Sequence, residues 1–177
     1  MRTSARRTAR SRTAERTPPA LRLAVQNAAG VAGLPARTTL RRWLARALAR
    51  DATVTVRFVS PAEGRRLNRT FRGRDYATNV LTFVYDVPAP ASARAHRTAP
   101  PLSGDIVLCV AVLRREARAQ RKSLRAHCAH LVIHGALHLS GYDHESAKDA
   151  RVMEALEVEL LDSLGYDNPY ATEAAPG

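Results

Sequence analysis

The segment from Ser123 to Leu139 constrains the fold of this chain most strongly, because it has the pattern of an apolar helix that also carries histidines. Five of the six histidines of the chain fall between positions 127 and 144. On a helix, His127, His130, His134 and His138 would occupy a stripe about 80° wide and point to one side. Any fold of this chain must therefore accommodate an apolar helix with a cluster of imidazoles along one edge.

The spacing of three of these histidines predicts a metal site. His134 and His138 lie one helical turn apart, so both imidazoles can reach a single ion. Gly141 lets the chain leave the helix and turn back, which would bring His144 to the same point. Three neutral nitrogens would then hold one ion, for which we expect zinc, and leave a fourth position for water, as is typical of catalytic zinc sites. Zinc lowers the pKa of bound water from about 15.7 to about 7, so hydrolysis is the chemistry we expect.

The remaining polar groups of this region leave alternatives open. We expect His127 to be structural, and His130 either to be structural as well or to contact a metal ligand or the substrate. Asp143 and Glu145 flank His144, and either could supply a catalytic carboxylate. Asp143 could equally orient an imidazole, and Glu145 could cap a helix.

One absence bears on the reaction class. A zinc protease helix normally carries glutamate directly after its first histidine, where it acts as the general base. In this chain that position is Gly135. Peptide hydrolysis would therefore lack its usual base, which makes a metalloprotease the weaker enzyme hypothesis.

The charge of the chain favours a polyanionic partner. It has 28 basic and 16 acidic residues among 177, a formal net charge of +12. Such a chain is attracted to nucleic acid, and its binding should weaken with salt. Cys109 and Cys128 lie among apolar residues and predict free thiols in a reducing compartment. We find no apolar run of about 18 residues and no signal-peptide core, so we expect a cytoplasmic protein without membrane contact.

The length allows one domain with flexible ends. We assign residues 20–166 to a metal-dependent hydrolase domain and 167–177 to a flexible C-terminal tail. Residues 1–19 are rich in arginine and poor in apolar residues, and we expect them to be disordered. This basic tail could be a nucleic-acid arm, a mitochondrial transit peptide or a dispensable extension.

The order of elements predicts an α+β domain, with a single mixed sheet of about four strands covered by helices and the metal site on a helix in the C-terminal half. Ser60-Pro-Ala-Glu63 has the spacing of a capping box with proline at the first helical position. The apolar patterns predict strands at 21–25, 53–59, 80–85 and 105–110, helices at 39–49, 60–67, 112–120, 123–139 and 146–164, and a surface loop at 87–103. The last helix should turn inward Val152, Met153, Leu156, Leu160 and Leu164.

The histidine segment resembles the signature of the YbeY family of bacterial ribosomal RNA maturation endoribonucleases, His-Gly-x-Leu-His-Leu-x-Gly-Tyr-Asp-His. Residues 134–144 match every fixed position of it. The resemblance extends over about residues 20 to 165 and includes two further segments. These are Leu67-Asn68 through Phe71-Arg72-Gly73 to Thr78-Asn79-Val80-Leu81-Thr82-Phe83, and Gly104-Asp105-Ile106.

The resemblance implies an α+β fold, a zinc ion, and single-stranded RNA as substrate, notably ribosomal RNA precursors and ribosomes under quality control. It implies the small ribosomal subunit as a partner, and it places the catalytic arginine of the family on Arg72. A guanidinium near a zinc-bound hydroxide could hold the scissile phosphate through two hydrogen bonds. The chain departs from the family pattern at Ala77, Thr82 and Val84.

Three hypotheses follow. The leading one is a zinc-dependent endoribonuclease in which His134, His138 and His144 bind the metal and, with Arg72, form the catalytic site. The enzyme alternative is a metalloprotease. The alternative of another class is a ribosome-binding assembly factor whose metal is structural.

Overall fold

The computed structural model describes residues 19–85 and 100–171. The predicted basic tail, apart from its last residue, and most of the predicted loop at 87–103 lie outside these ranges. The elements in chain order are β1 (Leu21–Asn27), α1 (Arg37–Ala47), β2 (Ala52–Val59), α2 (Pro61–Arg72), β3 (Val80–Val84), β4 (Leu102–Cys109), α3 (Val110–Ala119), α4 (Leu124–Leu139) and α5 (Ala147–Ser163). None of the helices in these ranges has the length and apolarity needed to cross a bilayer.

The four strands form one mixed sheet in the order β1-β2-β4-β3. Strands β1, β2 and β4 are parallel to one another, and β3 pairs antiparallel to β4 at the edge of the sheet. The prediction of an α+β fold with one four-stranded mixed sheet is confirmed. Strand β4 lies between β2 and β3, and its apolar sequence fits this position because central strands are buried on both sides.

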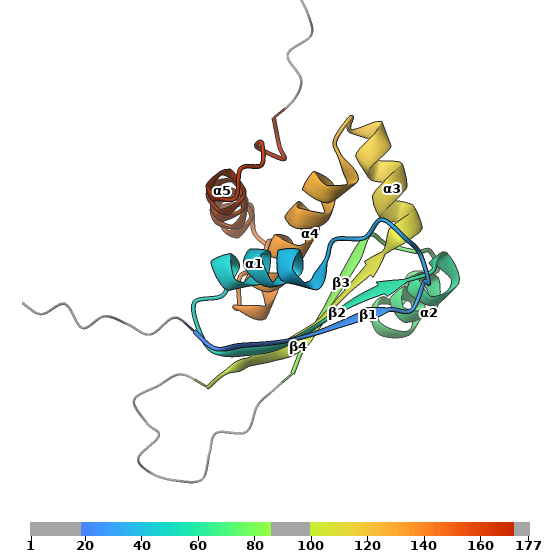
Figure 1. Ribbon diagram of the computed structural model, residues 1–177, viewed down its shortest axis with the longest axis horizontal. Helices are drawn as coiled ribbons and strands as arrows, with labels where there is room; N and C mark the ends of the chain where they lie inside the picture. Colours follow the sequence, from blue (N-terminus) through green and yellow to red (C-terminus); the bar gives the residue numbers. More distant parts are fainter. Residues whose placement is uncertain (1–18, 86–99, 172–177) are drawn as a thin grey trace, which may run out of the picture.

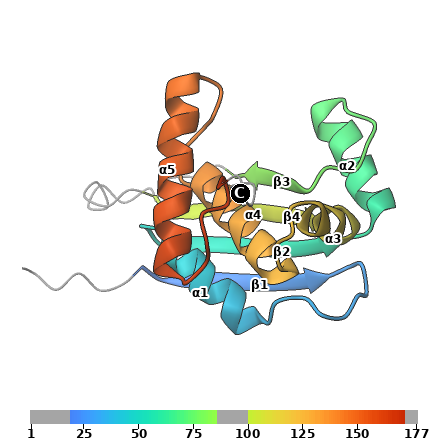
Figure 2. The ribbon, with the colours of Figure 1, turned by 90° about the horizontal axis from the view of Figure 1, so that it is seen from above.

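Alternate residues of β4 divide the interior into two clusters, because successive side chains of a strand point to opposite faces. Ile106 and Leu108 belong to the main core, which also includes apolar residues of α1, α4 and α5. Val107 and Cys109 belong to a smaller cluster on the other face, against which Leu67 of α2 packs. Figure 1 shows α1, α4 and α5 on the same side of the sheet, and Figure 2 shows α2 beside the edge strand β3.

Serine side chains begin three of the helices. The Ser60 hydroxyl accepts a hydrogen bond from the Glu63 backbone N–H, one of the two bonds of the predicted capping box, whereas the Glu63 carboxylate accepts from Arg57. Ser123 and Ser146 begin α4 and α5 in the same way. Helix α2 continues beyond the predicted end at Leu67 to Arg72, and Gly73, with φ of 66°, ends it in the left-handed conformation. Arg72 is therefore the last residue of a helix and does not belong to a loop.

The phase of α5 differs from the prediction in one respect. Val152 was expected to face inward, but its side chain is 47% exposed. The buried residues of α5 are Met153, Glu157 and Leu161, which are spaced four residues apart. A helix face identified from apolar residues alone does not include Glu157, the charged residue in the middle of the buried face.

Gly104 lets β4 approach its neighbours closely. A Cβ atom at this position would collide with the carbonyl oxygen of Phe83 on β3 and with the side chain of Leu139 on α4. Neither neighbour can move freely, since one is a strand backbone and the other lies in the core. The glycine therefore permits both the pairing of β3 and the packing of the end of α4.

We expect Gly104→Ala to lower the free energy of unfolding by at least about 2 kcal/mol, because the core must shift to admit the methyl group. Urea denaturation followed by circular dichroism measures this change. Gly64→Ala on α2 is the matched control, since its Cβ would make ordinary contacts of 3.4 to 3.7 Å. The control should be neutral or stabilising, because alanine favours helix over glycine. Equal stability of the two variants would contradict the steric argument.

Candidate metal centre

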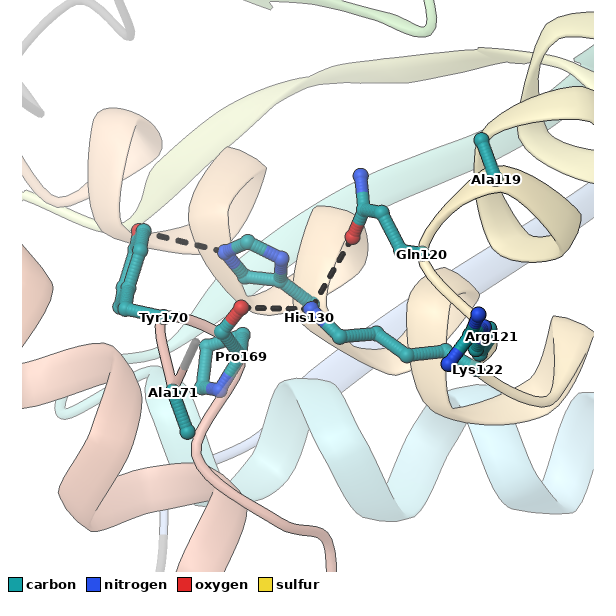
Figure 3. Close-up of a pocket in the computed structure, with 8 residues that line it drawn as sticks. All are labelled: Ala119, Gln120, Arg121, Lys122, His130, Pro169, Tyr170 and Ala171. Atoms are coloured by element: carbon teal, nitrogen blue, oxygen red, sulfur yellow. Dashed lines mark hydrogen bonds between the residues drawn. The ribbon is translucent and has the colours of Figure 1, made fainter. Parts of the chain in front are cut away.

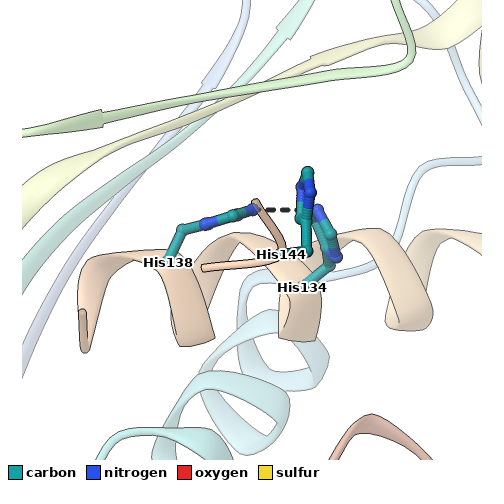
Figure 4. A group of neighbouring side chains, drawn as sticks. All are labelled: His134, His138 and His144. Atoms are coloured by element: carbon teal, nitrogen blue, oxygen red, sulfur yellow. Dashed lines mark hydrogen bonds between the residues drawn. The ribbon is translucent and has the colours of Figure 1, made fainter. Parts of the chain in front are cut away.

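The structure brings His134, His138 and His144 together at the C-terminal end of α4 (Figure 4). One ring nitrogen from each lies within 4.8 Å of the others. His134 and His138 are half-buried on the helix, and His144 is exposed in the segment that follows it. The three histidines can together bind a metal ion.

Gly141 makes this arrangement possible. Its φ of 91° is positive, a backbone conformation that residues other than glycine rarely adopt. The chain reverses there, and the Tyr142 N–H donates to the Leu137 carbonyl. The Asp143 carboxylate then accepts from the backbone N–H of His144 at 2.7 Å. Asp143 therefore positions the backbone of His144, and the structure gives it no bond to an imidazole.

Hydrogen bonds to Nδ1 determine which nitrogen is available in the two helical histidines. His134 Nδ1 lies 2.7 Å from the Glu157 carboxylate, and His138 Nδ1 lies 3.0 Å from the Tyr142 carbonyl. A carbonyl and an ionised carboxylate only accept, so both Nδ1 atoms carry the proton. Burial, together with the nearby His134, lowers the pKa of His138 and favours its neutral form. A neutral imidazole with its proton on Nδ1 presents an unprotonated Nε2, the form in which histidine binds a metal.

These two Nε2 atoms face each other at 3.1 Å. Two lone pairs at this distance repel each other unless a cation lies between them. Tetrahedral zinc with Zn–N bonds of about 2.0 to 2.1 Å would separate two such nitrogens by about 3.3 Å. The donor set and its spacing therefore fit a transition metal.

Glu157 of α5 is a functional residue that the sequence analysis missed. Its side chain is only 1% exposed, and both of its oxygens are hydrogen-bonded. Burial alone would raise its pKa, but hydrogen bonds from His130, His134 and Tyr170 outweigh burial and lower the pKa to about 2. It is therefore an ionised carboxylate that orients His134, as carboxylates commonly do behind metal-binding histidines. An acidic residue within the apolar stripe of the last helix was the signal that could have revealed it.

His130 contacts this carboxylate, and its ring lies edge-on to that of His134 with centroids 6.4 Å apart, but it does not belong to the group of three histidines. Its Nε2 lies 2.9 Å from one Glu157 oxygen, which also accepts from the Tyr170 hydroxyl. Figure 3 shows His130 facing Tyr170, whose hydroxyl lies 3.3 Å from the same Nε2. Burial and the nearby carboxylate raise the pKa of Tyr170, so its hydroxyl remains a donor. Lys122 donates to the Pro169 carbonyl and holds the segment that carries Tyr170 against the start of α4. Residues 167–171, which the sequence analysis assigned to the C-terminal tail, thus contribute to the support of His134.

His127 lies at the other end of the histidine stripe, in a separate network. Its side chain is 3% exposed, and Nε2 lies 2.9 Å from Glu116 of α3. The same Glu116 oxygen accepts from the Asn79 amide at 3.0 Å, just before β3. Burial lowers the pKa of His127 despite this carboxylate. The network joins α3, α4 and the start of β3, which agrees with the structural role expected for His127.

Arg72 lies beside the metal group. A cavity of about 500 Å³ is lined by Arg72 at the end of α2, by His138 and His144, and by residues of the turn after α4. Thr82 and Val84 of β3, two of the three positions that depart from the family pattern, also line it. We call this cavity the metal cleft. A ligand in the metal cleft can contact the metal and the guanidinium group at the same time.

Glu145 and Gly135 bear on which acidic group could act beside the metal. Glu145 lines the metal cleft and does not begin α5, whose N-cap is Ser146. Gly135 faces away from the metal, and a Cβ there would lie 3.0 Å from Ile106 of β4. A glutamate at position 135 would therefore be directed into the sheet and not toward the metal.

The fold and the site define an α+β protein with a partly exposed group of three histidines that can hold a metal ion beside an arginine. Residues 30–165 match the family model described as "Endoribonuclease YbeY". The chain is 53% identical over 157 residues to the endoribonuclease YbeY of Cupriavidus necator, which covers 87% of this chain and 75% of that one. It is 54% identical over 154 residues to the endoribonuclease YbeY of Aromatoleum aromaticum, and the alignment covers 85% of this chain and 93% of that protein. A solution structure from Thermotoga maritima aligns with 85% of this chain and 99% of that one, at 23% identity and a TM-score of 0.45.

The chain belongs to the YbeY family of endoribonucleases. The resemblance noted in the histidine segment is confirmed, and it extends over most of the chain. The predicted class of enzyme, a metal-dependent endoribonuclease, is confirmed at the level of the family.

We expect Glu157→Gln to weaken zinc binding by about 10- to 100-fold, because an amide no longer fixes His134 in the required tautomer and orientation. Competition with a chromophoric chelator measures the affinity. Glu154→Gln, an exposed position on the same helix, is the matched control and should bind as the unchanged chain does. Thermal melting of the metal-free variants separates loss of affinity from loss of fold. A folded Glu157→Gln variant with full affinity would disprove the orienting role.

Proposed function

We propose that this protein is a zinc-dependent endoribonuclease that cuts single-stranded RNA in ribosomal RNA maturation and ribosome quality control. His134, His138 and His144 would hold the zinc ion, and Arg72 would contact the scissile phosphate. The observation that carries the proposal is that Arg72 and two of these histidines line one cleft. A phosphodiester is the group that can engage a cation and a guanidinium together.

A zinc ion in this site would supply a nucleophilic water at neutral pH and polarise a phosphoryl oxygen. The residues of the chain would bind the phosphate and orient the metal-binding imidazoles. The planar fork of Arg72 can donate two N–H groups to two phosphate oxygens and stabilise the charge that develops on them. Glu157 and the Tyr142 carbonyl keep His134 and His138 oriented without reorganisation during the reaction.

The exposure of His144 supports a catalytic metal over a structural one. A structural zinc site is usually closed by four protein ligands. Among the described residues, only three histidines form the group, and the third is exposed at the metal cleft. Three histidine ligands would leave a fourth position on a bound zinc ion for water or substrate.

The partners and location are part of the same proposal. We propose ribosomal RNA and the small ribosomal subunit as partners, supported by the family and by the net charge of +12. A cytoplasmic location agrees with these partners and with the two buried free cysteines.

Purified protein should cut a single-stranded RNA, and His134→Ala, His138→Ala or removal of metal by a chelator should abolish cutting. Gel analysis of labelled RNA measures this, with metal content determined on protein purified without a histidine tag. Zinc should restore activity to the chelated wild-type chain and not to the variants. If His138→Ala unfolds instead of remaining a folded protein that binds RNA without cutting it, the structural-metal hypothesis gains. Casein cleavage without RNA cleavage would favour the protease.

Arg72→Ala should lower the rate of cleavage at saturating RNA by about 100- to 1,000-fold, the usual loss when a donor to the transition state is removed. Zinc content should not change, because Arg72 is not among the ligands. Arg72→Lys should recover little, since an ammonium cannot form the planar pair of hydrogen bonds. Arg74→Ala, two residues further along and also exposed, is the control. A cleavage rate for Arg72→Ala equal to that of the control would remove Arg72 from the mechanism.

A further inference from the structure

Helix α2 exposes a row of arginines that ends at the metal cleft. Arg65, Arg66, Arg69 and Arg72 are all exposed, and we call them the α2 arginine stripe. On the helix they fall within about 120° of one another and extend about 10 Å along the axis. The buried side of α2, with Gly64 and Asn68, faces the sheet. The stripe therefore faces solvent along its length and reaches the metal cleft through Arg72.

Three arginines of α1, in contrast, hold the fold together. On α1, the guanidinium groups of Arg37 and Arg41 donate to backbone carbonyls of β1, at 2.7 and 2.9 Å. Arg42 of the same helix donates to the Leu164 carbonyl at the end of α5. These side chains tie α1 to its neighbours and are not available to a ligand.

The α2 arginine stripe is different. Arg65 forms two hydrogen bonds to Asp75, both of them exposed. Within residues 19–85 and 100–171, the guanidinium groups of Arg66, Arg69 and Arg72 donate no hydrogen bond. Exposed cations without such bonds add little to folding stability, and they leave their donors free for phosphate oxygens.

An exposed aromatic ring lies at the C-terminal end of α2, one residue before Arg72 and about 100° around the helix from it. Phe71 is 62% exposed, although phenylalanine is usually buried. Its ring is held edge-to-face against Phe83 of the edge strand β3, with centroids 4.9 Å apart. The ring is thus fixed in position next to Arg72 and open to solvent. Arginines beside an exposed aromatic ring are the combination by which proteins bind single-stranded nucleic acid, because phosphates pair with the cations and a base stacks on the ring.

We propose that the α2 arginine stripe and Phe71 form a binding track for single-stranded RNA outside the metal cleft. The RNA backbone runs along the exposed side of α2, one base stacks on Phe71, and the strand then enters the metal cleft past Arg72. This inference rests on the proposed function, since it assigns the surface that presents the substrate to the site. Charge complementarity identifies the occupant, because the segment from Pro61 to Tyr76 holds five arginines and only two acidic residues.

The double variant Arg66→Gln/Arg69→Gln tests the track without altering the catalytic residues. Binding of a fluorescent 2′-O-methyl RNA, which resists cleavage, is measured by anisotropy at several salt concentrations. The variant should bind about 10-fold more weakly, with a slope of log Kd against log salt smaller by about 1.4, because each lost phosphate contact contributes about 0.7. Arg22→Gln/Arg151→Gln removes the same charge from exposed positions on β1 and α5 and should leave the slope unchanged. Equal effects of the two pairs, or no effect of the first, would overturn the proposal.

Phe71 provides a second, independent measurement. Phe71→Ala should weaken binding by roughly 5- to 100-fold, and Phe71→Tyr should retain it, because tyrosine keeps the stacking face. Phe71→Trp adds an exposed fluorophore to a chain whose single tryptophan, Trp43, is 1% exposed. RNA should quench its emission. Full binding by Phe71→Ala, or an unquenched Phe71→Trp, would refute the stacking contact.

Cleavage by the wild-type chain, assayed in parallel, separates this proposal from the proposed function. If the chain cuts RNA but the stripe and Phe71 variants bind as the wild type does, the track fails and the function stands. If the chain does not cut RNA but these variants lose binding, the function fails and the track stands. Displacement of the RNA by polyglutamate at equal charge concentration would point to an acidic protein partner and overturn the assignment to RNA.

Discussion

The structure depends on the burial of α4. This helix is apolar around most of its circumference, and a helix of this kind is stable only when other elements enclose it. The sheet, α1, α3 and α5 all pack against it. Gly135 and Gly104 permit close packing between α4 and β4, because larger residues would collide there. The edge that carries His130, His134 and His138 is only half-buried, so the core does not enclose it completely.

Burial of α4 also explains how the metal centre is organised. Glu157 occupies a position on α5 that an apolar side chain would otherwise fill, and it remains charged because three donors surround it. A buried carboxylate without such partners would be strongly destabilising. His130 and Tyr170 supply two of these donors, and His134 supplies the third. The packing of α5 and of the segment after it is therefore coupled to the orientation of a metal ligand.

The metal cleft and the α2 arginine stripe have separate structural origins. The metal cleft arises where the turn at Gly141 brings His144 back over the end of α4, next to the edge strand β3. The stripe arises because α2 packs one side against the smaller cluster and leaves its arginines in solvent. The two meet at Arg72 because Gly73 ends α2 at that point. A strand of RNA guided by the stripe would reach the metal from a defined direction.

The sequence by itself determined the elements with strong local signals and identified the three histidines that the fold brings together. Capping serines, helix-ending glycines and the four-residue spacing of His134 and His138 are local properties, and local geometry follows from them. Only the tertiary structure decided that Arg72 lies at the metal cleft, that Glu157 orients His134, and that Val152 is exposed while Leu161 is buried. These facts depend on contacts between residues far apart in the chain: the resemblance indicated Arg72 and the stripe of the last helix could have indicated Glu157, but neither pattern identifies the partner that each side chain contacts.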